Sequence, residues 1–200
     1  MGEVVDDRSF NVNTYCMEAP NSSRLDPNAW VRAAYEMFEE GGVSAVRIDP
    51  LAKKLGITRG SFYWHFENRA ALLRALLDRW VEGETERVIE ENERGGGTAS
   101  DRLRRLLWTC ATEDGRLEMG VREWAGGDEN AREIVRRVDD RRIAYMADLA
   151  REAGAPNSDA KARARIAYVA WLGFYTGIAP TTTEQRIADM DQLHCMMVSS

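Results

Sequence analysis

The chain has 200 residues and a formal net charge of −6. Its length suffices for a small domain and a larger one that share helices, or for one continuous helical body. The acidic balance argues against a protein that coats nucleic acid without regard to sequence, although a sequence-specific regulator needs only a basic docking face.

The three cysteines are Cys16, Cys110 and Cys195, and their spacing fits no zinc-binding pattern. An odd number of cysteines is typical of a reducing compartment, so we expect a cytoplasmic protein. We also expect no bound metal and no cofactor. No run approaches the roughly 20 apolar residues of a membrane span, and we therefore expect no membrane partner.

Residues 1–24 mix polar and apolar groups without a period, which predicts a flexible N-terminal arm. Arms of this kind can enter the minor groove of DNA. The acidic residues Glu3, Asp6 and Asp7 argue against such a contact here.

The first predicted helix begins at Pro27, with Asp26 as its cap. Its apolar residues recur at helical spacing from Trp30 to Phe38, and Gly41-Gly42 ends it. A second helix is predicted to have Asp49 as its cap and Pro50 as its first residue.

Gly56 ends this second helix, and Thr58 can cap a third, Thr58–Phe66. Two helices joined by a short turn that contains glycine form a helix-turn-helix unit. Within the third helix, Phe62 and Phe66 are expected in the core.

The segment from Pro27 to Leu77 resembles the DNA-binding domain of the TetR family of bacterial transcriptional regulators. The residues that carry the resemblance form one ordered pattern: Ala34, Phe38, Gly41, Ile48, Leu51, Ala52, Leu55, Gly56, Ile57, Thr58, Gly60, Ser61, Phe62, Tyr63, His65, Phe66, Arg69 and Leu72. The family usually has Lys where Arg69 stands, and Arg keeps the charge.

The resemblance implies that Thr58–Phe66 is a recognition helix in the major groove. Arg59 is the best candidate for reading a base, because its guanidinium can bond guanine O6 and N7 together. Ser61 is expected to contact a base edge or a phosphate, and Tyr63 and His65 are expected to contact phosphates. Trp64 could either pack within the protein or contact the DNA backbone. The DNA-binding candidates are Arg47, Thr58, Arg59, Gly60, Ser61, Tyr63, Trp64, His65 and Arg69. The alternative for Tyr63 and His65 is packing between helices.

The remaining chain reads as helical throughout, without the alternation of a strand. One long helix from Asn68 to Arg94 is predicted to link the DNA-binding part to the rest, and Gly95-Gly96-Gly97 interrupts it. The predicted fold is all-α, with a three-helix DNA-binding domain at 25–71 and a larger helical effector-binding and dimerisation domain at 72–200.

The last two predicted helices indicate a homodimer, because in the family these helices form a four-helix interface. The candidate interface residues are Ile166, Val169, Ala170, Gly173, Gly177, Ile187, Met190, His194 and Met197. A twofold dimer presents two recognition helices to one face of DNA and so requires a near-palindromic operator. The alternative is that both stripes pack within one subunit.

Bulky amphipathic side chains in the C-terminal part suggest a small-molecule site. The candidates are Trp80, Trp108, Met119, Arg122, Trp124, Tyr145, Trp171 and Tyr175. Arg122 beside Trp124 suits an anionic or planar ligand. The alternative is an ordinary core, where aromatic residues at helical spacing are usually found.

These features predict a repressor that a small-molecule effector releases from its operator. The alternatives are an activator of the same fold and, less favoured, an interaction module that has lost DNA binding. No catalytic triad order, carboxylate pair or phosphate loop appears, which argues against an enzyme.

Overall fold

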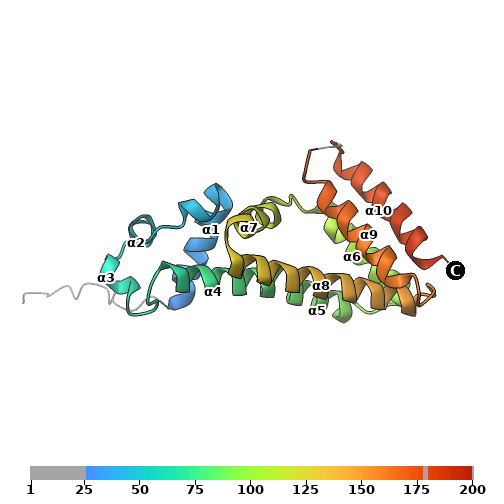
Figure 1. The fold of residues 1–200 in the computed structure, drawn as a ribbon, viewed down its shortest axis with the longest axis horizontal. Helices are drawn as coiled ribbons and strands as arrows, with labels where there is room; N and C mark the ends of the chain where they lie inside the picture. The colour runs from blue at the N-terminus through green and yellow to red at the C-terminus, as the bar shows by residue number, and fades with distance from the viewer. Residues whose placement is uncertain (1–25, 178–179, 200) are drawn as a thin grey trace, which may run out of the picture.

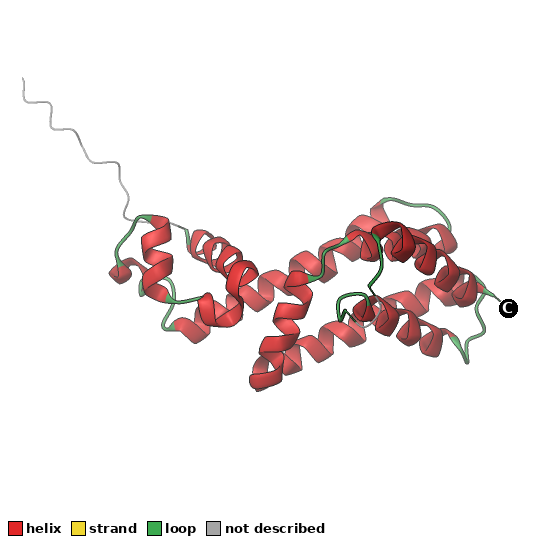
Figure 2. Ribbon diagram, turned by 90° about the horizontal axis from the view of Figure 1, so that it is seen from above, coloured by secondary structure: helices red, strands yellow, loops and turns green. Residues whose placement is uncertain are grey.

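The computed structural model describes residues 26–177 and 180–199, and every regular element within these ranges is a helix (Figures 1 and 2). The predicted arm at 1–24 and Cys16 lie outside the described residues. The elements are α1 Pro27–Ala45, α2 Ile48–Leu55, α3 Arg59–Phe62, α4 Arg69–Val81, the π-helix η1 Glu82–Glu86, α5 Arg87–Arg94, α6 Ala99–Thr112, α7 Arg116–Gly127, α8 Glu129–Glu152, α9 Ala160–Gly173 and α10 Thr183–Val198.

The first two helices begin differently. The Asp26 carboxylate accepts a hydrogen bond from the Asn28 amide at 3.1 Å and caps α1, as predicted. The predicted cap of α2 is wrong, because α2 begins at Ile48 with Arg47 in the capping position. Pro50 lies in the first turn of α2, where the missing N–H would have no partner within the helix.

A continuous helical rod joins the two ends of the molecule. It comprises α4, η1 and α5, and covers the predicted Asn68–Arg94 helix (Figure 1). The Asn68 side chain caps its start by accepting from the Ala71 amide at 3.0 Å. The sequence did not indicate the π-turn Glu82–Glu86 in the middle of the rod. Short π-turns inside α-helices often mark functional positions.

Helices α6 and α10 are capped by short polar side chains. Thr98 with Asp101, and Thr182 with Gln185, form reciprocal capping boxes at the starts of α6 and α10. The cap of α10 is therefore Thr182. Helix α10 packs along α6, and α9 packs along α8.

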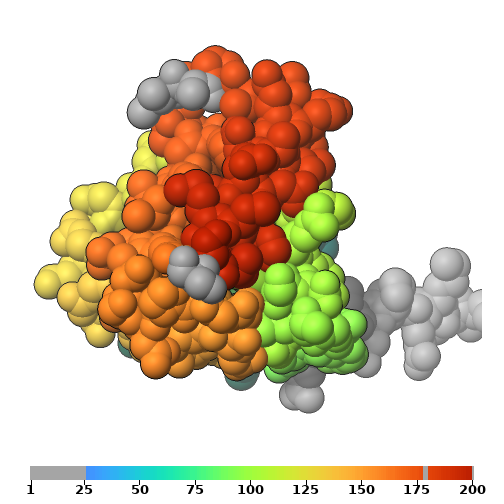
Figure 3. Space-filling view, turned by 90° about the vertical axis from the view of Figure 1, so that its right-hand side faces the viewer, coloured from blue at the N-terminus to red at the C-terminus, as the bar shows by residue number. Residues whose placement is uncertain are grey.

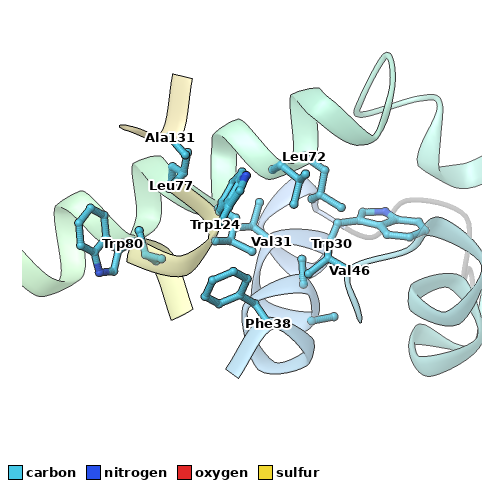
Figure 4. Packing of buried hydrophobic residues seen from close by; sticks show 14 of the residues in the cluster. Trp30, Val31, Phe38, Val46, Leu72, Leu77, Trp80, Trp124 and Ala131 are labelled. Atoms are coloured by element: carbon cyan, nitrogen blue, oxygen red, sulfur yellow. The ribbon is translucent and has the colours of Figure 1, made fainter. Parts of the chain in front are cut away.

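Two apolar clusters hold the fold together. The first joins α1–α4 to α7 and the start of α8, and in Figure 4 Trp124 of α7 lies beside Val31 and Phe38 of α1. The second lies among α5, α6 and α8–α10. The helices from α5 to α10 are called the body below. Because the first cluster extends past residue 71 into α7 and α8, the body packs directly against the helix-turn-helix unit.

Candidate nucleic-acid interface and internal cavity

A buried aromatic group anchors the short helix α3. Phe62 is fully buried, lies edge-to-face on Trp30 at 5.2 Å and stacks on Phe66 at 5.5 Å. The prediction that Phe62 and Phe66 belong to the core is confirmed. Regular α-helix ends at Phe62, earlier than predicted, although the Phe66 amide still bonds to the Phe62 carbonyl at 3.0 Å.

The turn before α3 sets the direction of that helix. Gly56 has a φ of 69°, a left-handed conformation that glycine adopts without a steric penalty, and its N–H satisfies carbonyls at the end of α2. Thr58 occupies the capping position of α3, although its side chain makes no capping hydrogen bond.

The opposite side of α3 presents aromatic and basic groups to solvent. Trp64 is 86% exposed and Tyr63 is 51% exposed. Arg59 donates a hydrogen bond to the Tyr63 hydroxyl at 3.3 Å and pairs with Asp49 at 3.4 Å. Exposed pairs of this kind contribute at most about 1 kcal/mol, so Arg59 can exchange them for another partner.

The other predicted contact residues surround this face, with one exception. Arg47, Thr58 and Gly60 are exposed, whereas Ser61 and His65 are half-buried. Arg69 donates to the Val46 carbonyl at 2.6 Å and to the Val43 carbonyl. Two of its nitrogens thus tie the start of α4 to the α1–α2 connection, a structural role that the sequence did not indicate.

The body contains an internal cavity of about 50 Å³, between α5, η1, α6, α8 and α9. Its lining is mainly apolar and includes the predicted Tyr145 and Trp171. Tyr168, Arg142 and Glu113 also line it, and the sequence analysis missed all three. They come from three distant segments, so no local motif could have revealed them.

Arg142 connects the cavity to the helical rod. Its guanidinium donates to the Glu118 carboxylate at 3.0 Å, the Thr85 hydroxyl at 2.9 Å and the Glu84 carbonyl at 3.0 Å. Its Nη1 also lies 3.3 Å from the Tyr168 hydroxyl. Thr85 and Glu84 belong to η1, so one side chain of α8 holds the cavity wall and the π-turn together.

The predicted role of Arg122 is not supported by its contacts. Its guanidinium donates to Asp139 at 2.6 Å and to Glu118 at 2.8 Å, and these carboxylates already satisfy it. Tyr168 donates to Asp139 at 2.7 Å. Arg122 is therefore part of a buried ion network rather than an open anion site.

Five of the other predicted effector residues do not line the cavity. Trp124 packs on Phe38 in the first cluster, and Trp80 is fully buried. Trp108 lies on the surface, where its indole donates to Asp191 at 2.8 Å. Met119 is half-buried. Helical spacing marks an apolar face but does not say which cluster that face joins.

Tyr175, the fifth, lies against the loop that carries Glu113. Its hydroxyl bonds to the Trp171 indole at 2.9 Å and donates to the Cys110 carbonyl at 3.2 Å. Gly115 has a φ of 68°, and a Cβ there would lie 2.2 Å from the Tyr175 ring. Only glycine lets the ring and this loop approach so closely.

Burial and charge change the titration of Glu113. Burial, followed by repulsion from Glu84, raises the pKa of Glu113 to about 7. Its carboxylate forms no hydrogen bond or ion pair with any residue that the structure describes. Arg186 lies close but donates to the backbone carbonyl of Glu113 at 3.3 Å.

The predicted dimer residues divide into two groups, one on α9 or just beyond it and one on α10; these two helices, orange and red, cover much of the face shown in Figure 3. On α9, Ile166 is 59% exposed and Val169 is 61% exposed. On α10, Met190 and Met197 are buried against the second cluster, and His194 bonds to Ser100 of α6 at 3.0 Å. That face of α10 packs within the subunit, so placing the buried Met190 and Met197 on a dimer surface was wrong. His194 is half-buried.

The remaining predicted dimer residues are less buried than Met190 and Met197. Ala170 and Gly173 are half-buried, and Gly177, just beyond the helix, is exposed. Ile187 of α10 is half-buried beside the second cluster.

Within residues 26–177 and 180–199, no group of three or more His, Cys, Asp or Glu side chains is arranged to hold a metal ion. No helix in the same ranges is long and apolar enough to cross a membrane.

Comparisons with known proteins agree with this geometry. Residues 31–76 match the family model "Bacterial regulatory proteins, tetR family". The chain is 41% identical over 56 residues to the tetracycline repressor protein class A from transposon 1721 of Escherichia coli, covering 28% of this chain and 26% of that repressor. The matched segment spans about a quarter of the curated relative's length.

Solved structures extend the likeness to the body. A putative TetR-family transcriptional regulator from Rhodococcus sp. superposes with a TM-score of 0.67 at 20% identity, over 86% of this chain and 98% of that one. A putative transcriptional regulator from Saccharomonospora viridis, solved in complex with choline, superposes with a TM-score of 0.71 at 19% identity, over 83% and 93%. At such identities the likeness concerns the fold alone.

Proposed function

We propose that this chain is a sequence-specific repressor of transcription of the TetR family, whose model matches residues 31–76, and that a small molecule releases it from its operator. The observation that carries the proposal is the solvent-facing side of α3 and of the turn that follows it, where Arg59, Tyr63 and Trp64 lie exposed above the buried Phe62 anchor. An anchored helix with basic and aromatic groups on its free side suits the major groove. The proposal places the chain in the cytoplasm, with the DNA, and assigns it no catalytic step.

Arg59 reads a base in this proposal. Its guanidinium lies on the free side of α3, held by a neutral hydroxyl and an exposed carboxylate that DNA can displace. Bidentate contact to guanine discriminates by about 1–3 kcal/mol. Tyr63 and Trp64 contact the phosphate backbone or thymine methyl groups beside it.

The proposal includes a homodimer formed through α9 and α10. Ile166 and Val169 project from α9, and Met196 of α10 is 63% exposed, so one end of the body carries apolar side chains that the subunit leaves in solvent. This end lies opposite α3 (Figure 1). A twofold axis here leaves both α3 helices free to meet half-sites about 34–36 Å apart in a near-palindrome.

The cavity is the effector site in this proposal, and Arg142 is the link to DNA. An occupant that displaces Arg142 pulls on Glu84 and Thr85, and so on the rod that continues into α4. Helix α4 packs on α1 through Leu72 and Leu76, which brings the motion to the DNA-binding unit. The ligand shifts operator affinity only by its differential affinity for the two arrangements.

Fluorescence anisotropy with DNA flanking the protein's own gene tests the DNA-binding part. We expect tight, salt-sensitive binding to one near-palindrome. Arg59→Ala should relax the preference at one base pair, whereas Arg136→Ala, which removes an exposed arginine of α8, should change nothing. Equal loss on every sequence for Arg59→Ala would remove its base-reading role.

A further inference from the structure

The charges around the cavity separate into a balanced set and a surplus. Arg122 and Arg142 face Glu118 and Asp139, so two cations meet two carboxylates in the buried network. The donors of both arginines are engaged there, and an anionic ligand would have to break these pairs. Breaking a buried pair is costly, so the cavity is poorly suited to an anion.

The charges around the cavity that lie outside this balanced network are negative. Glu84 and Glu113 also line the cavity, and neither is part of an ion pair among the residues that the structure describes. Among the described residues, the Glu84 carboxylate accepts a hydrogen bond from the Tyr35 hydroxyl alone, at 3.3 Å. A partly desolvated carboxylate without a counter-ion is unfavourable, and a cation beside it relieves that penalty.

The aromatic walls favour the same charge. The rings of Tyr168 and Trp171 lie 5.4 Å apart on one side of the cavity, and Tyr145 lines it from α8. Arg142 already lies 5.5 Å from the centroid of the Trp171 ring. Tyrosine and tryptophan faces attract cations, and aromatic cages are the usual sites for alkylated ammonium groups.

We infer that the cavity takes an organic cation, whose ammonium group lies between Glu113 and the rings of Tyr145, Tyr168 and Trp171. The inference rests on the proposed role of the cavity as the effector site. A volume of about 50 Å³ holds a headgroup rather than a whole ligand. The rest of the ligand must therefore widen the cavity, and widening acts on Arg142 and η1.

Titration calorimetry on the full-length protein without DNA tests the ligand class. The probes are benzyltrimethylammonium, its neutral carbon isostere neopentylbenzene, and the anion phenylacetate, all at pH 8. We expect the cation to bind at least tenfold more tightly than the isostere, a difference of about 1.4 kcal/mol. Equal affinity of cation and isostere, tighter binding of phenylacetate, or no heat from the cation at millimolar concentration would overturn the inference.

Glu113→Gln identifies the carboxylate responsible. It should weaken cation binding about tenfold and leave the isostere within about twofold, whereas Glu133→Gln, at an exposed position of α8, should alter neither. Unchanged cation affinity in Glu113→Gln would refute the assignment. Melting curves confirm that both variants fold.

The wild-type protein offers an independent check. Since the pKa of Glu113 is about 7, cation affinity should fall about tenfold from pH 8 to pH 6 while isostere affinity stays constant. The charged groups around Glu113 are Glu84, Glu118, Asp114, Arg142 and Arg186. A flat pH profile for the cation would overturn the assignment.

The two proposals fail in different ways. If no operator is bound but the cation binds through Glu113, the proposed function fails and the ligand class stands. If an operator is bound and the protein binds the cation no more tightly than its isostere, the inferred ligand class fails and the proposed function stands.

Discussion

Replacing Arg142 with methionine should destabilise the protein markedly. The side chain of Arg142 is 11% exposed, and that of its partner Glu118 is 7% exposed. Arg142 joins α8 to α7, α9 and η1 through polar contacts, and methionine keeps a similar length without a donor. The Thr85 hydroxyl and the Glu84 carbonyl then lose a donor in the interior.

The loss in unfolding free energy depends on the partners that Glu118 keeps after the substitution. Removing one member of a buried ion pair costs about 3–5 kcal/mol, because the other charge stays behind. Glu118 keeps Arg122 as a partner at 2.6 Å, so we expect the lower end, about 3 kcal/mol. For a chain of this length, about 2–4 °C per kcal/mol gives a fall in Tm of about 6–12 °C.

Thermal unfolding followed by circular dichroism measures the change. Arg136→Met, at an exposed position of the same helix, is the control and should shift the unfolding free energy by at most about 0.5 kcal/mol. A double-mutant cycle with Glu118→Gln isolates the pair, since Arg142→Met should cost less once the carboxylate is neutral. If Arg142→Met lowers Tm no more than Arg136→Met does, or if the cycle gives no coupling, then the network does not hold these helices together.

Three further outcomes are expected. Val169→Glu places a charge on the exposed face of α9 and should give a folded monomer in analytical ultracentrifugation; an unchanged dimer would remove α9 from the interface. Trp64→Ala should weaken operator binding at unchanged Tm, whereas Phe62→Ala should cost about 3–5 kcal/mol of stability; a fall in Tm for Trp64→Ala would show that Trp64 packs. The pKa of Glu113 is raised from 4.5 to about 7, so the stability of the native state falls as the pH rises through this window. Glu113→Gln should therefore raise Tm by about 2–4 °C at pH 8 and have little effect at pH 4. A gain of the same size at both pH values would contradict this.

Local sequence signals predicted the helices well. Asp26, Asn68 and Gly56 act through neighbours a few residues away, and the structure places all three at helix ends. The start of α2 was predicted wrongly because Asp followed by Pro, as in Asp49-Pro50, is a favourable sequence for a helix N-terminus. The chain begins the helix two residues earlier and leaves the Asp49 carboxylate near Arg59.

The cavity was harder to predict, because its polar groups come from distant parts of the chain. Glu113, Arg142 and Tyr168 are separated by dozens of residues and meet only after α6, α8 and α9 pack. Two residues of the predicted dimer surface were misassigned for a different reason. A stripe such as Met190 and Met197 looks the same whether it contacts another helix of the subunit or a second subunit, and only the position of α6 decides.

The π-turn Glu82–Glu86 also sets the angle between two parts of one rod. Each residue of an α-helix turns the chain by about 100°, so a single inserted or deleted residue re-aims everything that follows. A π-turn accommodates one extra residue while the hydrogen-bonded rod continues on both sides. A residue gained or lost at this turn would therefore change the rotation of α4 relative to α5 without altering any residue of α3.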